Sequence, residues 1–111
     1  MKNYRYLHAQ EEVGESSWFG FSIIIDSNAP FTREELVQIF IQHEIEVRPI
    51  VAGNFAKNET MHWYKFEIHN KLKNADYIDL NGLFIGNHHY PMHQHLNVLK
   101  SALNQLASIN D

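Results

Sequence analysis

The stretch FTREELVQIFI, residues 31–41, carries the clearest secondary-structure signal in the chain. Thr32 followed three residues later by Glu35 forms a capping box, in which each side chain bonds the backbone N–H of the other residue. Apolar side chains then recur with the spacing of one helix face. The stretch therefore predicts an amphipathic helix from about residue 33 to residue 43.

The segments on either side of this helix have the character of strands. Residues 18–25, WFGFSIII, are aromatic and β-branched and lie between turn-forming residues, which is typical of a strand buried on much of both faces. Gly20 within it indicates a bulge or a close backbone approach. Residues 45–51 predict a second strand. Pro49 cannot donate a ladder hydrogen bond, so this strand is expected at a sheet edge or interrupted there.

The remainder of the chain predicts a short helix at residues 74–80, ended by Gly82, and a short strand at residues 83–85. Leucines recurring at i, i+3, i+7 and i+10 predict a long amphipathic helix from about residue 93 to residue 107. Residues 61–69 fit either a strand or irregular packing. The expected fold is α+β, with a short, mostly antiparallel sheet and helices packed on one face.

Composition limits the classes of protein to consider. The chain has 111 residues, 44% of them apolar, which suffices for one domain. Residues 1–15 are polar and are expected to be a loosely ordered lead-in to a domain at residues 16–111. The net charge is −4, and the charged residues form no block of like sign, which argues against nucleic acid as a partner. Cysteine is absent, which excludes disulfides and thiolate nucleophiles and suits a reducing compartment.

No signal-peptide pattern and no apolar run near the roughly 20 residues of a membrane helix is present in the sequence. We therefore expect a cytoplasmic protein that neither spans nor binds a membrane.

Eight histidines raise the question of a metal site. His89 and His93 have the i, i+4 spacing of helical metal ligands, but Pro91 between them disfavours a helix there, and no HExxH pattern supplies further ligands. We predict no metal site. His88 or His89 could instead act as a donor to a substrate, because imidazole titrates near neutrality.

Arg48 opens the segment RPIVAGNF and has two interpretations. On the polar face of an edge strand it would pair with Glu46 or with solvent. Alternatively, its planar guanidinium would hold a phosphate, a carboxylate or a sugar hydroxyl. Asn54 and Asn87 each follow a glycine after an apolar run. Asn is most often a turn former at such positions. We nevertheless expect neighbouring strands to bring the two turns close together, where they could form the edge of a shared pocket.

Aromatic residues are numerous for a domain of this size, at 13% of the chain. A core this small cannot hide every ring, so some should remain on the surface as a patch. Such a patch would suit docking to a larger partner or to another part of the same polypeptide.

Several motifs in a fixed order resemble a known family. They are SWFGFS at residues 17–22, IEVRPIVAGNF at 45–55, NADYID at 74–79 and GLFIGNH at 82–88. Together they resemble the C-terminal small domain of the DegT/DnrJ/EryC1/StrS family of vitamin B6-dependent nucleotide-sugar enzymes, and in particular its sugar 3-dehydratase branch. The resemblance runs from about residue 16 to the last helix. It implies the small α+β domain of a type I fold enzyme, whose large N-terminal cofactor-binding domain has no counterpart in these residues.

The resemblance also implies a chemistry. Enzymes of this branch use pyridoxal or pyridoxamine 5′-phosphate to remove the 3-hydroxyl from a GDP- or CDP-linked 4-keto-6-deoxyhexose, for the deoxysugars of lipopolysaccharide O-antigen. Arg48, Asn54, Asn87 and His88 would lie on loops facing the active-site cleft and bind the substrate, whereas no catalytic residue and no cofactor ligand is assigned to this chain. The full enzymes are homodimers, and the isolated domain is expected to be inactive and to bind no cofactor by itself. A nucleotide-sugar aminotransferase of the same family, or a non-catalytic ligand-binding or interaction module, is the alternative.

Overall fold

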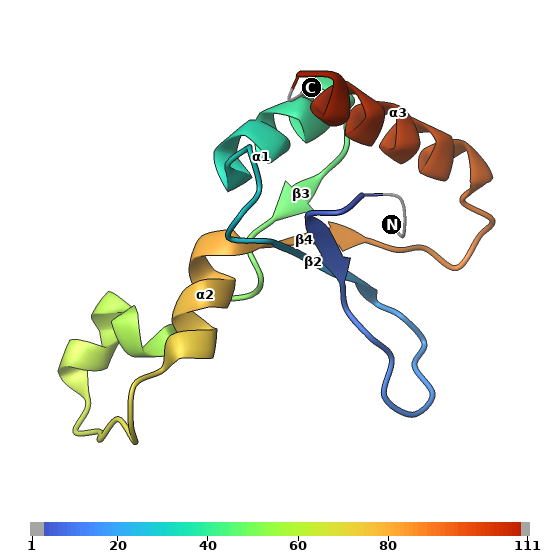
Figure 1. Cartoon of the computed structure of the whole chain (residues 1–111). Coiled ribbons are helices and arrows are strands. Elements are labelled where there is room, and N and C mark those ends of the chain that lie inside the picture. Colours follow the sequence, from blue (N-terminus) through green and yellow to red (C-terminus); the bar gives the residue numbers. More distant parts are fainter. Residues whose placement is uncertain (1–3, 110–111) are drawn as a thin grey trace.

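A computed structural model describes residues 4–109, and within that range the chain forms one four-stranded antiparallel sheet and three α-helices (Figure 1). The sheet order is β1-β2-β4-β3, so β2 and β4 are central and β1 and β3 are the edges. The elements are β1 (Leu7–Ala9), β2 (Gly20–Ile25), α1 (Arg33–Gln42), β3 (Val47–Arg48), the 3₁₀ helices η1 (Phe55–Lys57) and η2 (Glu59–Trp63), α2 (Lys73–Asn81), β4 (Gly82–Gly86) and α3 (His93–Ile109). The predicted α+β class is confirmed.

The helix α1 begins where its capping box predicts. The Thr32 N–H donates to Glu35 Oε2 at 2.7 Å, and the Glu35 N–H donates to Thr32 Oγ1 at 3.2 Å. These two bonds satisfy backbone donors that the first helical turn leaves without partners. The apolar stripe of α1 then packs against the sheet and buries Phe40 completely.

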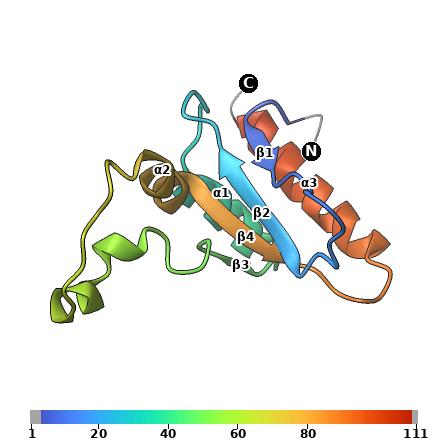
Figure 2. The ribbon, with the colours of Figure 1, turned by 90° about the horizontal axis from the view of Figure 1, so that it is seen from below.

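The core lies between one face of the sheet and the helices α1 and α3, which both cover that face (Figure 2). The register pairs Ile23 of β2 with Leu83 of β4, and both side chains point to the covered face. The buried apolar residues are Leu7, Ile23, Ile25, Leu36, Ile39, Phe40, Leu83, Ile85, Ala102, Leu103 and Leu106. The predicted helix at the C-terminal end therefore exists as α3. Leu103 and Leu106 of its leucine stripe supply one wall of the core, whereas Leu96 is 57% exposed.

Gly20 marks a close approach of two strands and not a bulge. The pairing of β2 with β4 is continuous from Gly20 opposite Gly86 to Ile24 opposite Gly82. A Cβ at Gly20 would lie 2.6 Å from the Ile85 carbonyl oxygen and would also collide with the ring of Phe84. Only glycine fits at this position, because Phe84 lies over its backbone.

The strand β1 was not predicted. Leu7 is 5% exposed and pairs with Ile25, so residues expected to be loosely held contribute to the core. Tyr4 packs beside it, and its hydroxyl donates to Asn104 Oδ1 of α3 at 2.8 Å. Three residues among polar neighbours are too few to show a period, so this strand has no recognisable pattern in the sequence.

The strand β3 is shorter than predicted. It occupies the sheet edge beside β4, as Pro49 indicated, but the prediction of a strand as far as residue 51 is wrong. Pro49 lacks the N–H that would continue the ladder. The chain turns instead, with Val51 at φ 48° and 94% exposed.

The predicted short helix exists as α2, but Gly82 ends it in an unexpected way. Gly82 has an extended φ of −94°, not a left-handed one. Glycine is required there because a Cβ would meet the Ile78 carbonyl oxygen and lie 2.7 Å from Ile50 Cδ1. Residues 61–69 contain the end of η2 and then a segment without regular secondary structure, which pairs with no strand among residues 4–109. Among residues 4–109, no helix is long and apolar enough to cross a membrane.

Candidate substrate-binding site

The sheet register places the four predicted substrate contacts at two separate locations. Because β3 runs antiparallel to β4, the chain leaving Arg48 reaches Asn54 beside the start of β4. Asn87 and His88 follow the end of β4, on the other side of a strand that spans roughly 13 Å. The expectation that neighbouring strands bring the two Gly-Asn turns together is therefore wrong for this chain. The substrate-binding role of the four residues itself remains a prediction.

Arg48 lies at the exposed edge of the sheet. Its Nη2 and Nε lie 2.6 Å and 3.0 Å from Glu46 Oε1, so the pairing with Glu46 predicted as its simpler role is present. The two side chains are 74% and 77% exposed, and an ion pair so open to solvent contributes little to stability. An anionic ligand could therefore replace Glu46 at small cost.

A shallow groove of about 240 Å³ runs between α1 and β3 next to Arg48. Val37, Val47 and Leu83 form its apolar floor, and Arg33 lies at its other side. Arg48 is thus one of the polar residues that line the groove, together with Arg33, Glu34 and Gln38.

Asn54 is the buried polar residue at the turn after β3, with only 6% of its surface exposed. Its Nδ2 donates to Asp76 Oδ1 at 2.8 Å, and its Oδ1 accepts from the Ala56 N–H at 3.1 Å, which caps η1. The preceding Gly53 has a φ of 63°, and a Cβ there would collide with the Asp79 carboxylate. Asn54 therefore fixes the direction in which the chain leaves the sheet.

Lys57 completes this cluster, because its Nζ lies 2.5 Å from Asp76 Oδ1. We call Asn54, Lys57 and Asp76 the arm anchor, since together they tie the segment after β3 to α2. The hydrogen bond from Lys57, followed by the one from Asn54, lowers the pKa of Asp76 below its ordinary value of 3.8. The same bond to Asp76 raises the pKa of Lys57 above 10.5.

The arm anchor gives a pH dependence with a defined sign. The folded pKa of Asp76 is lowered, so its contribution is complete above about pH 4 and is lost as the pH falls through that folded pKa. The folded pKa of Lys57 is raised, so its contribution is complete below 10.5 and is lost as the pH rises through the folded value. The anchor should therefore hold throughout the neutral range.

Asp76→Asn should release the segment after β3 from α2, because it removes the charge that binds Lys57 while keeping the shape of the side chain. We expect backbone amides of residues 55–63 to exchange with deuterium at least about threefold faster at pH 7. Glu59→Gln, which neutralises an exposed carboxylate on η2, is the matched control and should leave the exchange unchanged. Equal exchange in Asp76→Asn and the unmodified chain would show that the anchor does not hold this segment.

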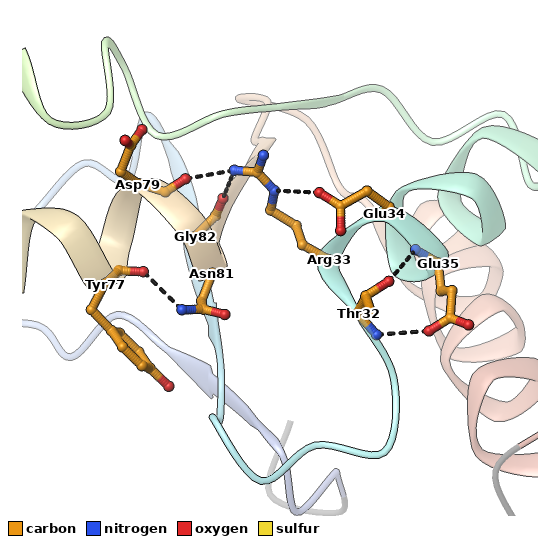
Figure 3. A network of polar contacts seen from close by, with 8 residues as sticks. All are labelled: Thr32, Arg33, Glu34, Glu35, Tyr77, Asp79, Asn81 and Gly82. Carbon is orange, nitrogen blue, oxygen red and sulfur yellow. Dashed lines mark hydrogen bonds and ion pairs between the residues drawn. The ribbon is translucent and has the colours of Figure 1, made fainter. Parts of the chain in front are cut away.

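Arg33, which the sequence did not single out, connects α1 to the junction of α2 and β4 (Figure 3). Its Nη1 donates to the Asp79 carbonyl oxygen at 2.7 Å and to the Gly82 carbonyl oxygen at 3.5 Å. A cation is favourable at a helix C-terminus, where carbonyl groups lack partners. Arg33 therefore fixes the end of α2 that carries Asp79, and no spacing in the sequence could reveal a contact between positions 46 residues apart.

Asn87 and His88 lie at the far end of β4. Asn87 Nδ2 donates to the Trp18 carbonyl oxygen at 2.8 Å, which joins this turn to the start of β2. The His88 ring stacks on Tyr90 at a centroid distance of 4.9 Å. Within residues 4–109, no three histidine, aspartate or glutamate side chains gather in a way that could hold a metal ion.

The four predicted contact residues do not converge on one point. Asn54 and Asn87 are committed to internal hydrogen bonds, Arg48 stands apart from His88, and the groove beside Arg48 has an apolar floor. A phosphorylated cofactor needs several converging donors, such as backbone N–H groups at a helix N-terminus. What the chain offers is an exposed arginine and a rigidly anchored turn.

The comparisons with known proteins first define the class. The chain matches a solved Escherichia coli enzyme that holds bound hydrated PLP, with a TM-score of 0.87 and 44% identity. The match covers 92% of this chain and 26% of that one. The fold is therefore that of the C-terminal part of a PLP-dependent enzyme.

The particular relative is GDP-4-keto-6-deoxy-D-mannose 3-dehydratase. The chain is 44% identical to that enzyme from Escherichia coli O55:H7 over 103 residues, which are 92% of this chain and 26% of the relative. It is 45% identical to the enzyme from Yersinia pseudotuberculosis over 100 residues, 86% of this chain and 25% of the relative. The lipopolysaccharide biosynthesis protein RfbH of Salmonella typhimurium is 27% identical over 89% of this chain and 23% of its own length.

The chain is similar over most of its length to the C-terminal part of these 3-dehydratases, which confirms the resemblance seen in its motifs. It spans about a quarter of the length of the curated relatives that it matches. No protein-family model matches the chain.

Proposed function

We propose that this chain works as the C-terminal small domain of a nucleotide-sugar 3-dehydratase that uses pyridoxal or pyridoxamine 5′-phosphate. The reaction is removal of the 3-hydroxyl from a GDP-linked 4-keto-6-deoxyhexose. The observation that carries the proposal is the 44% identity over 92% of the chain, with a TM-score of 0.87, to an enzyme named for that reaction. A structure of this relative with bound GDP-perosamine supports a nucleotide sugar as the ligand.

In this proposal the chain supplies substrate-side contacts and the rest of the enzyme supplies the cofactor site. Arg48 is suited to the diphosphate or to a sugar hydroxyl, because its guanidinium presents several donors and is exposed. Asn87 and His88 would contact the substrate from the other end of β4, where another domain or subunit closes the cleft. Asn54 would act by holding the turn after β3 in place. We also propose that the full enzyme is a homodimer and that it is cytoplasmic.

The aminotransferase alternative is not favoured, because the relatives above 40% identity are both named as 3-dehydratases. A non-catalytic binding module would differ in that it functions without a cofactor domain. No contact among residues 4–109 favours that alternative.

The test is a hybrid enzyme, in which this chain replaces the matching C-terminal quarter of the Escherichia coli 3-dehydratase. We expect the hybrid to bind the cofactor and to remove the 3-hydroxyl of the GDP-linked substrate with a kcat/KM within about tenfold of the parent, a change of about 1.4 kcal/mol. The isolated chain, titrated with pyridoxal or pyridoxamine phosphate, should give neither a specific absorbing complex nor turnover. A folded, cofactor-loaded hybrid that transaminates the sugar or leaves it unchanged would contradict the proposal.

A further inference from the structure

The protein exposes more surface than a compact chain of its mass. Its accessible surface is 8938 Å², whereas a folded monomer of 13.0 kDa is expected to expose about 6,300 Å². Its radius of gyration is 15.9 Å against roughly 13 Å for a compact domain of this length. The excess of about 2,600 Å² is roughly three times the 800 Å² that one partner contributes to a standard interface.

Part of the excess comes from the segment after Asn54, residues 55–72, which we call the arm. It projects from the body of the domain beside α2 (Figure 1), and none of its side chains is buried. Trp63 is 87% exposed and Tyr64 is 69% exposed. The large apolar residues that the arm exposes are Phe55, Trp63, Tyr64, Phe66 and Ile68. Aromatic side chains of this kind are typical of the centres of interfaces.

The sheet contributes a second part of the excess accessible surface. The helices α1 and α3 cover one face, while the opposite face is open and turned toward the viewer in Figure 2. On this open face Phe84 lies opposite Arg48 in the register, and Phe19, which is 88% exposed, stacks on Phe84 at 5.7 Å. The arm projects on this side of the sheet, away from α1 and α3 (Figure 1). The arm and the open face therefore lie on the same side of the domain, and Arg48 is on the edge strand of that face.

The arm is held in place although it makes few contacts of its own. The arm anchor ties its first residues to α2, and Arg33 fixes the end of α2 to α1. A loose tail would lose much conformational entropy on binding, whereas an anchored arm is already organised for it. These contacts suit a segment that docks on a fixed partner.

We infer that the arm and the open face of the sheet are the surface on which the preceding, larger part of the enzyme packs. The partner of this surface would be the rest of the enzyme, because about three quarters of each relative's chain lies outside the matched region. The excess area is large enough for a permanent contact between domains. This inference rests on the proposed function. It also places Arg48 at the rim of the interface, where a substrate would be enclosed between the two domains.

Hydrogen–deuterium exchange tests the inference by comparing the isolated chain with the hybrid enzyme. In the hybrid, amides of residues 55–72 and of the segment around Phe19 should exchange at least roughly tenfold more slowly than in the isolated chain. Amides around Leu96 and Val98 on α3, which are also exposed, should exchange equally in both and serve as the control.

The outcomes separate the inference from the proposed function. A hybrid that turns over substrate while its arm exchanges as fast as in the isolated chain would overturn the inference and leave the function intact. Protection of the arm without turnover would support the inference and contradict the function. Protection of the arm in the isolated chain that grows with its concentration would assign the surface to a second copy, and would also overturn the inference.

A second measurement does not depend on folding of the hybrid. The isolated chain should bind an apolar dye such as ANS, and replacing both Trp63 and Phe66 by Ser should lower the bound dye by about half. The control Leu96→Ser should leave dye binding unchanged. Equal dye binding by the double variant and the unmodified chain would overturn the assignment of the arm.

Discussion

Phe40→Ala should lower the free energy of unfolding of the chain by about 3–5 kcal/mol, which is a large share of the 5–15 kcal/mol typical of a whole domain. Phe40 is completely buried and comes from the middle of α1, where it packs between the sheet and α3. Truncation removes the apolar contacts of the ring and leaves a cavity that the rigid central strands cannot fill. Urea unfolding followed by circular dichroism measures the loss as a lower midpoint with an unchanged slope.

The matched control is Phe19→Ala, which truncates a ring that is 88% exposed. It should change the free energy of unfolding by about 1 kcal/mol or less. If Phe40→Ala does not fold, Phe40→Leu should still unfold measurably earlier than Phe19→Ala, because it loses part of the same packing. Equal midpoints for changes at the two positions would show that the core is not where the structure places it.

Arg48→Ala in the hybrid enzyme should lower kcat/KM roughly 10- to 150-fold, which corresponds to the 1.5–3 kcal/mol of a hydrogen bond to a charged group. Its effect on stability should stay within about 0.5 kcal/mol, because the pair with Glu46 is open to solvent. The two effects differ because Arg48 contributes little to the fold and, in the proposed role, much to holding an anionic or hydroxyl-rich ligand.

Two variants define the role of Arg48 more closely. Arg48→Lys keeps the charge but loses the planar fork, so its kcat/KM should lie between those of Arg48→Ala and the unmodified hybrid. Arg5→Ala removes an exposed arginine that precedes the opposite edge strand, and should leave kcat/KM unchanged. An unchanged kcat/KM in Arg48→Ala would return Arg48 to the simpler role of a surface partner for Glu46.

The features that the sequence predicted well depend on neighbours along the chain. The capping box of Thr32 and Glu35 needs only three residues of separation, and the leucines of α3 show their period directly. Pro49 correctly indicated an edge position for β3, because a missing N–H is a property of that one residue. Local chemistry therefore sufficed for α1, α3 and the class of fold.

The features that the sequence could not predict depend on contacts between distant positions. The strand β1 exists because Leu7 pairs with Ile25, and three residues show no period of their own. The arm anchor joins Asn54 to Asp76, 22 residues apart. Asn54 and Asn87 looked equivalent because both follow a glycine, yet the antiparallel register of β3 and β4 places them at opposite ends of a strand. Topology, not residue type, decided that part of the candidate site.

Turnover by the hybrid enzyme is the most direct test of the central claim, that this chain is the small domain of a GDP-4-keto-6-deoxyhexose 3-dehydratase. The product should lack the 3-hydroxyl, and kcat/KM should lie within about tenfold of the value for the Escherichia coli parent. A hybrid that folds, binds the cofactor and yet eliminates no 3-hydroxyl would contradict the account.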